Sequence, residues 1–125
     1  PYPIGVNPKK IEVDIRRLDA VIPDNIDIDL IKLDVEGAEY KVLLGATETI
    51  KRNKPHIIFE NARIHADGYG ISSEMIFDLL TKEFQLNLYS LDGTGPLSNQ
   101  DFKKKIEYSY VTNYGRNAET NFLAK

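Results

Sequence analysis

The sequence has no cysteine and no tryptophan, and only one methionine and two histidines among its 125 residues. Without cysteine there is no disulfide framework and no thiolate metal site. No stretch approaches the roughly 20 consecutive apolar residues that a membrane-spanning helix needs. Sixteen Lys and Arg against nineteen Asp and Glu give a net charge of −3, so the clustered positive charge that binds a nucleic-acid backbone is missing. We expect a cytoplasmic protein with neither a nucleic-acid nor a membrane partner.

The residues that are present suit one folded domain, because 42% are hydrophobic and 28% are charged. Apolar residues alternate over residues 11–15, which predicts an edge or antiparallel strand, and they fill nearly every position of residues 28–35, which predicts a central strand. A helix over residues 37–53 follows, with Glu39 among the residues expected to face water. Residues 56–59 then form a second buried strand that ends at Glu60.

The second half of the chain continues this alternation. Ser72 is a plausible N-cap for a further helix, and residues 84–91 alternate like a strand before a turn. Residues 106–111 and 120–124 are both strand candidates; we take the latter as the strand and the stretch before it as irregular. The order of elements predicts a layered α/β sheet whose parallel strands have right-handed crossovers.

Three carboxylates lie where predicted strands end: Asp34 and Glu36 at the end of the first buried strand, and Glu60 at the end of the second. A buried carboxylate needs a partner, or a cleft such as the one beyond the carboxyl ends of parallel strands. Structural roles remain open for all three. Asp34 could pair with Lys32, Glu36 could favour a helix N-terminus, and Glu60 could pair with Arg63 or cap its loop.

If the two strands are neighbours, Asp34 and Glu60 share one edge of the sheet. There they could bind a divalent cation together, or one could act as a general base on a hydroxyl group. His65 follows in a loop and could take up a proton, although a lone loop histidine is more often a solvated surface residue. His56 lies at the other end of its strand and has no expected site role. Residues 103–105, three lysines, indicate a solvated face.

Residues 28–40 and 54–60, with the segment Asp34-Val35-Glu36-Gly37-Ala38-Glu39 at their centre, resemble the FkbM family of S-adenosylmethionine-dependent methyltransferases. Residues 17–19 and 121–124 extend the resemblance over most of the chain. It implies a partial Rossmann-like class I methyltransferase sheet with an antiparallel last strand. It also implies methyl transfer to a hydroxyl oxygen of a small molecule or sugar, with Asp34, Glu36 and Glu60 as catalytic residues and Asp34 as first candidate for the base or orienting group.

The resemblance also bears on metal binding. In related catechol-type methyltransferases, acidic and amide residues at comparable strand ends bind a divalent cation, and Asp34, Glu60 and Asn61 are analogous in position. This is analogy alone, so no residue is assigned to a metal.

The sequence also departs from the family pattern. It has no strand that leads into a glycine-rich turn and no acidic residue for the ribose; Gly5 stands isolated between prolines. Residues 1–125 therefore resemble the C-terminal part of a single methyltransferase-like domain, and we expect the chain alone to bind S-adenosylmethionine weakly or not at all. The strand over residues 28–35 would then lack neighbours on one side, which predicts self-association.

Two other interpretations remain open. The chain could keep a methyltransferase-like fold without activity and serve as a binding or regulatory remnant. Residues 29–35 also resemble the phosphoacceptor strand of a response-regulator receiver, in which Asp34 would be phosphorylated. The acidic pair and the late lysine that a receiver needs do not stand at suitable positions in this sequence.

Overall fold

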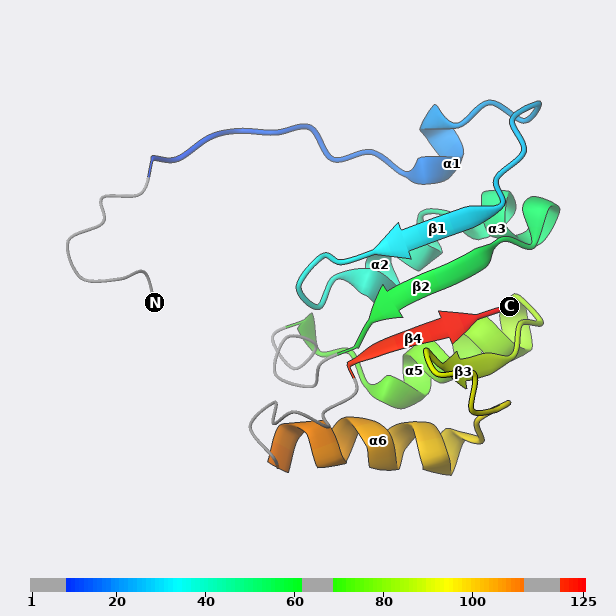
Figure 1. Cartoon of the computed structure of the whole chain (residues 1–125). Coiled ribbons are helices and arrows are strands. Elements are labelled where there is room, and N and C mark those ends of the chain that lie inside the picture. The colour runs from blue at the N-terminus through cyan, green and yellow to red at the C-terminus, as the bar shows by residue number, and fades with distance from the viewer. Residues whose placement is uncertain (1–8, 62–68, 112–119) are drawn as a thin grey trace.

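The computed structural model describes residues 9–61, 69–111 and 120–125. In these residues β1 (Leu30–Leu33), β2 (His56–Glu60), β4 (Asn121–Ala124) and β3 (Leu88–Ser90) form one sheet, in that spatial order. β1 and β2 are parallel, and β4 runs antiparallel to both of its neighbours (Figure 1). This open mixed sheet confirms the expected partial Rossmann-like α/β fold and its antiparallel last strand.

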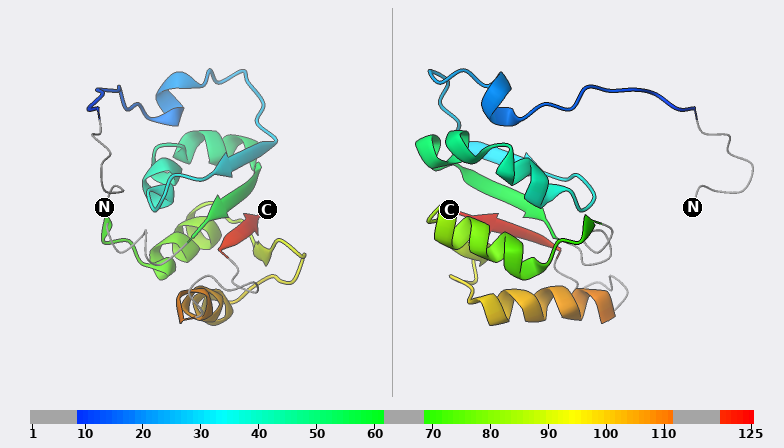
Figure 2. Two further views of the ribbon diagram at one scale, coloured as in Figure 1. Left: turned by 60° about the vertical axis from the view of Figure 1, so that its left-hand side comes forward. Right: turned by 180° about the vertical axis from the view of Figure 1, so that it is seen from behind.

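The helices gather on one side of this sheet, as the view from behind shows (Figure 2). They are α2 (Glu39–Leu44), α3 (Thr47–Asn53), α5 (Ser73–Asp78), which continues into the π-helix η2 (Leu79–Glu83), and α6 (Asn99–Val111). Burial alternates along the strands accordingly. The covered face carries the buried residues Leu33, Ile57, Phe59, Leu88, Phe122 and Ala124. The open face carries Leu30, Lys32, His56, Ile58, Glu60, Tyr89, Asn121 and Leu123, none of them buried.

Aromatic packing joins α6 to the covered face. The Phe102 ring of α6 meets Phe122 edge-on at 4.8 Å between centroids, and it lies 6.3 Å from Phe59. Phe77 of α5 contacts the same ring at 6.1 Å. Since Phe59, Phe102 and Phe122 are fully buried, this cluster is the centre of the core.

The predicted strand over residues 11–15 is wrong. Residues 9–17 form an extended arm that pairs with no strand and leads away from the sheet (Figure 1). Ile11, Val13 and Ile15 are 73%, 72% and 93% exposed. Alternation gave the correct extended shape, but a strand also needs a neighbour, and the described residues supply none to the arm.

The central place predicted for the strand over residues 28–35 is also wrong, because β1 is an edge strand of the described sheet. Its dense apolar sequence does not reflect burial on two faces, since Leu30 is 57% exposed. The parallel crossover from β1 to β2 is confirmed. So is the expectation that this strand lacks a partner on one side among the described residues.

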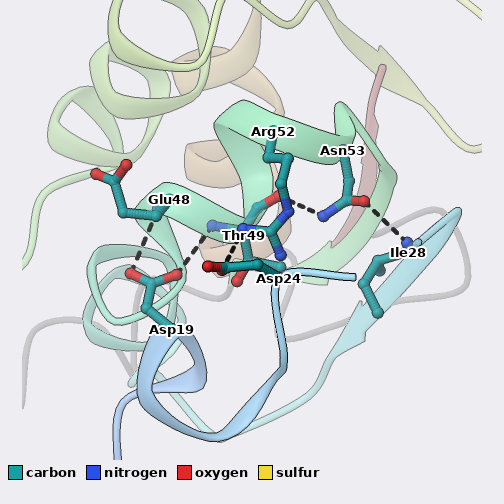
Figure 3. A network of polar contacts seen from close by, with 7 residues as sticks. All are labelled: Asp19, Asp24, Ile28, Glu48, Thr49, Arg52 and Asn53. Atoms are coloured by element: carbon teal, nitrogen blue, oxygen red, sulfur yellow. Dashed lines mark hydrogen bonds and ion pairs between the residues drawn. The ribbon is translucent and has the colours of Figure 1, made fainter. Parts of the chain in front are cut away.

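The helix predicted over residues 37–53 is interrupted at Gly45 and Ala46, which separate α2 from α3. The interruption depends on Asp19, a residue of the short helix α1 (Leu18–Val21). Its backbone amide donates to the Gly45 carbonyl at 2.9 Å. Its carboxylate accepts from the amides of Glu48 and Thr49 at 3.3 and 2.9 Å, as Figure 3 shows. A cap supplied from another part of the chain thus starts a second helix.

The network in Figure 3 also fastens the rest of the segment between α1 and β1 to α3. Arg52 pairs with Asp24 at 3.2 Å, and the Asn53 Oδ1 accepts from the Ile28 amide at 3.2 Å. Partial burial raises the pKa of Asp19, but hydrogen bonds from Thr49, Glu48 and Arg17 outweigh that effect, so its pKa lies below the ordinary value.

Two further expectations need correction near the C-terminus. Residues 106–111, weighed as a strand and then taken as part of an irregular stretch, belong to α6, because Phe102 and Ile106 lie one helical turn apart and are both buried. β3 covers only Leu88–Ser90, since the amides of Phe84 and Leu86 donate back to Leu79 and Leu80 and so close off η2 instead. The N-cap role of Ser72 is confirmed: its Oγ accepts from the Met75 amide at 3.2 Å.

No helix in the described parts of the chain is long and apolar enough to cross a bilayer.

Candidate functional site

The carboxyl ends of β1 and β2 lie side by side, as expected from the sequence. Leu33 pairs with Phe59 in the parallel register, and the next residues along the two strands are Asp34 and Glu60. Alternation directs both of these toward the open face, together with Lys32. Glu60 lies within β2 and is half-buried, whereas Asp34 follows β1 and is exposed. We call Asp34, Glu36 and Glu60 the acidic rim.

Asp34 forms an ion pair with Lys32, whose Nζ lies 3.2 Å from Oδ2. The two residues are two positions apart in sequence and lie on the same face of the strand. The structure therefore confirms the pairing of Asp34 with Lys32 that the sequence analysis kept as an alternative. Both side chains are at least half exposed, at 50% and 59%, and a pair of this kind adds little to stability. The pair holds the Asp34 carboxylate on the open face, within reach of a ligand from solvent.

The turn between β1 and α2 has an unusual backbone at Glu36, whose φ is 52°. Gly37 follows at 97°, a value that favours glycine. Lys54 and Gln85 also have positive φ in the described residues, but each stands at the end of a helix, where this conformation is common. Glu36 has no such explanation. Strained residues of this kind cluster at functional sites.

The Glu39 side chain stabilises this turn from its buried side. This contradicts the expectation that Glu39 faces water. It is only 2% exposed, and its Oε1 accepts a hydrogen bond from the Val35 amide at 3.0 Å. As the first residue of α2 it also meets the positive end of the helix. Its position four residues after Val35, at a helix start that follows a glycine, was the available sequence signal.

Asn61 lies next to Glu60 and is 3% exposed. Its amide N–H donates to the Thr120 carbonyl at 2.7 Å, but the buried Nδ2 atom has no hydrogen-bond partner among the described residues. An unmet buried donor is destabilising by about 1–3 kcal/mol and is uncommon in folded proteins. The sequence considered Asn61 only by analogy with metal sites; nothing in its pattern shows the unmet donor.

The arrangement offers carboxylate oxygens at the edge of the sheet. Among the described residues, no group of three or more His, Cys, Asp or Glu is placed to hold a metal ion. His65 and Arg63 lie outside the described residues, so the roles considered for them stay predictions. His56 is exposed at the opposite end of β2 from Glu60. What the rim can do is accept hydrogen bonds from hydroxyl groups, attract a cation and take up a proton.

Comparison with known proteins adds a family. Residues 2–90 match the model of the methyltransferase FkbM domain, which covers β1, the whole acidic rim and β2. Searches of the curated proteins and of the solved structures found no match.

Proposed function

Because the chain belongs to the FkbM methyltransferase family, we propose that it takes part in transferring a methyl group from S-adenosylmethionine to a hydroxyl oxygen of a small molecule or sugar. The family supports methyl transfer in general. The observation that carries the choice of a hydroxyl acceptor is the acidic rim, because Asp34 and Glu60 adjoin at neighbouring strand ends on a face that the described helices leave uncovered. The family match also favours methyl transfer over a phosphorylated receiver.

The carboxylates supply the protein's part of the chemistry. A hydroxyl oxygen that gains a methyl group must lose its proton, and a carboxylate within hydrogen-bond reach can accept it. Glu60 is the better placed of the two strand-end carboxylates, since it is half-buried in β2 while Asp34 is exposed and holds Lys32. We assign proton uptake to Glu60 and orientation of the acceptor to Asp34. The strained Glu36 provides a further contact from the turn.

The residues fit the methyl donor only in part. S-adenosylmethionine, when bound, supplies the electrophilic methyl group on a sulfonium cation, and the carboxylates of the acidic rim suit that positive charge. A cradle for the remainder of the cofactor needs several glycines between a strand and a helix, but the turn from β1 to α2 contains Gly37 alone. The described residues therefore fit the methyl-facing side of the cofactor and not its adenosine.

The rim also restricts the acceptor. Three carboxylates at one edge repel phosphorylated or carboxylated compounds, and a single lysine, already paired with Asp34, compensates for only part of that charge. Neutral hydroxyl compounds are the matching class.

The test is methyl transfer from labelled S-adenosylmethionine to a panel of neutral sugars and small alcohols, measured with the longest natural polypeptide that carries this sequence. Glu60→Gln keeps the size of the side chain and removes the base, so we expect kcat to fall by about 10²-fold to 10⁴-fold. Asp34→Asn is expected to lower kcat about tenfold through poorer orientation. Glu83→Gln, in η2 at an exposed position, is the matched control and should leave kcat unchanged.

Equal activity of Glu60→Gln and the natural protein would contradict the assigned role of the rim. If no acceptor is methylated while S-adenosylmethionine still binds, the alternative of a non-catalytic binding protein gains support instead.

A further inference from the structure

An exposed aromatic ring belongs to the same end of the sheet as the acidic rim. Tyr69 precedes α5 and is 48% exposed, and the Lys41 ammonium group of α2 lies 4.6 Å from the centre of its ring. α2 follows β1 through the turn that carries Glu36, and Tyr69 lies in the connection that leaves β2 at Glu60. The segment before α5 accordingly lies beside the start of α2, at the arrowhead end of β2 (Figures 1 and 2). This placement does not depend on the outer edge of β1.

The local backbone keeps the Tyr69 ring outside the core. Gly70 has a φ of 66°, a left-handed conformation that glycine adopts without strain. Across Gly70 the chain passes from the exposed Tyr69 to Ile71, which is 6% exposed and belongs to the core. A Cβ atom at Gly70 would meet no atom of the described residues within 4 Å. The ring is therefore anchored next to a buried residue, with open space beside its backbone.

We propose that Tyr69 is a specificity-determining residue: its ring binds the apolar face of a saturated cyclic acceptor while the acidic rim binds the hydroxyl groups of that acceptor. Lys41 covers one face of the Tyr69 ring, and about half of the side chain remains exposed for the ligand. This inference rests on the proposed methyl transfer to a hydroxyl oxygen. It adds the shape of the acceptor, a ring instead of an open chain.

An aromatic ring beside carboxylates matches a cyclic hydroxyl compound. Such a compound has C–H bonds above and below its mean plane and hydroxyl groups around its periphery. Small-molecule sites combine apolar and aromatic surface with a few placed polar groups. Val35, between Asp34 and Glu36 in the sequence, is 38% exposed and adds apolar surface at this end of the sheet. An open-chain alcohol can reach the carboxylates, but it has no flat C–H face to lie against Tyr69.

Lys41 acts through Tyr69 and is a positioning residue. A tyrosine side chain has few rotatable bonds, and a cation over its ring restricts the ring further. A ring that is already ordered loses less conformational entropy when a ligand binds.

Ligand binding provides the first test, measured by saturation-transfer NMR with the longest natural polypeptide that carries this sequence. The probes are myo-inositol and sorbitol, which have equal numbers of carbons and hydroxyl groups although only inositol is cyclic. Methyl β-glucopyranoside is a second cyclic probe. We expect the unchanged protein to bind the cyclic probes at least about fivefold more tightly than sorbitol. Tyr69→Ala should remove this preference, and Tyr69→Phe, which keeps the ring, should retain it.

Tyr89→Ala is the matched control. Lys125 lies over the Tyr89 ring at the same distance of 4.6 Å, but Tyr89 is on β3, two strands away from β2 in the sheet. This variant should keep the preference for cyclic probes. Circular dichroism verifies that each variant is folded.

A double-mutant cycle tests Lys41. Lys41→Met keeps the length of the side chain and removes its charge, so it should weaken inositol binding about threefold in the unchanged protein. It should have no effect in the Tyr69→Ala variant, because Lys41 acts through the ring. Lys41→Arg retains a cation and should restore binding. Equal weakening by Lys41→Met in both backgrounds would contradict the positioning role.

The methyl-transfer assay separates this inference from the proposed function. Tyr69→Ala should raise KM for a cyclic acceptor about tenfold and change kcat less than about twofold, whereas Glu60→Gln lowers kcat. If cyclic acceptors are methylated and Tyr69→Ala leaves their preference unchanged, the inference is wrong and the proposed function stands. If cyclic probes bind through Tyr69 and nothing is methylated, the proposed function is wrong and the ring-binding role stands. Equal affinities for inositol and sorbitol, or no binding of either cyclic probe, would overturn the inference.

Discussion

The two faces of the sheet differ in what they contribute. The covered face is apolar except for the buried Ser90 of β3, and it is sealed by α5, α6 and the ring cluster of Phe59, Phe102 and Phe122. The open face carries an ion pair, an exposed histidine and two carboxylates at one edge, with no fully buried side chain. Neighbouring residues of one strand therefore lie in different environments, one side in the core and the other on a face that the described helices leave uncovered.

This comparison explains why the acidic rim is tolerated. A carboxylate on the covered face would lose its hydration and would need a buried partner. On the open face, Asp34 retains water and a lysine, and Glu60 is only half-buried. The alternation of β1 and β2 thus lets Asp34 and Glu60 stand at the edge of a sheet whose other side is the core.

The largest predicted effect comes from a substitution on each face at adjacent positions of β4. Phe122→Ala removes a fully buried ring that touches both Phe59 and Phe102. It should lower the free energy of unfolding by about 3–5 kcal/mol. Leu123→Ala, next to it on the open face, should lower that free energy by about 1 kcal/mol or less, because its side chain is only half-buried.

Urea unfolding followed by circular dichroism measures both values. Similar losses for the two variants would mean that the open face is covered in solution, and the division between the faces would then be wrong.

Local pattern predicted the parts of the fold whose partners are near in sequence. The parallel pair β1 and β2, the cap at Ser72 and the strand ends at Asp34 and Glu60 all follow from short-range alternation and spacing. The errors arose where a distant residue decides the outcome. The break between α2 and α3 depends on Asp19, whose carboxylate lies 2.9 Å from the Thr49 amide nitrogen although the two residues are 30 positions apart in sequence.

The same limit applies to the candidate site. The residue types at the rim were visible in the sequence, but the burial of Glu39 and of Asn61 was not. Periodicity assigned Glu39 to the water-facing side of its helix; its hydrogen bond to the Val35 amide depends on the shape of the turn before the helix. The buried Asn61, by contrast, contacts Thr120, which is distant in sequence, and no local pattern contains such a tertiary contact.

The second prediction concerns Glu39, the acidic residue that lies on the buried side of the turn while the rim lies on the exposed side. Glu39→Ala leaves the Val35 amide without its acceptor and opens space beneath the turn. We expect the free energy of unfolding to fall by about 2 kcal/mol. Glu39→Gln retains an oxygen acceptor and should restore most of that loss. Urea unfolding of both variants provides the measurement, and equal losses would show that the hydrogen bond is not what stabilises the turn.

The smallest predicted effect is at Asp19, a residue of α1 that caps α3 and belongs to neither face of the sheet. Asp19→Ala removes the acceptor for the Glu48 and Thr49 amides and should lower the free energy of unfolding by about 1 kcal/mol at neutral pH. Asp24→Ala is the control, because its single ion pair with Arg52 is exposed and should change that free energy by a few tenths of a kcal/mol at most.

The effect of Asp19 has a defined pH dependence. Its pKa in the folded chain is below the ordinary value, since the amide hydrogen bonds outweigh partial burial, so the ionised carboxylate binds a proton less readily in the folded than in the unfolded state. Its stabilising contribution is therefore complete above the ordinary aspartate pKa and is lost as the pH falls through the lowered, folded-state value. Urea unfolding of the unchanged chain and of Asp19→Ala across this acidic range should show the two converging as the pH falls. A difference that stays constant with pH would mean that the charge of Asp19 contributes nothing to the cap and that the fastening of α1 to α3 depends on neutral contacts alone.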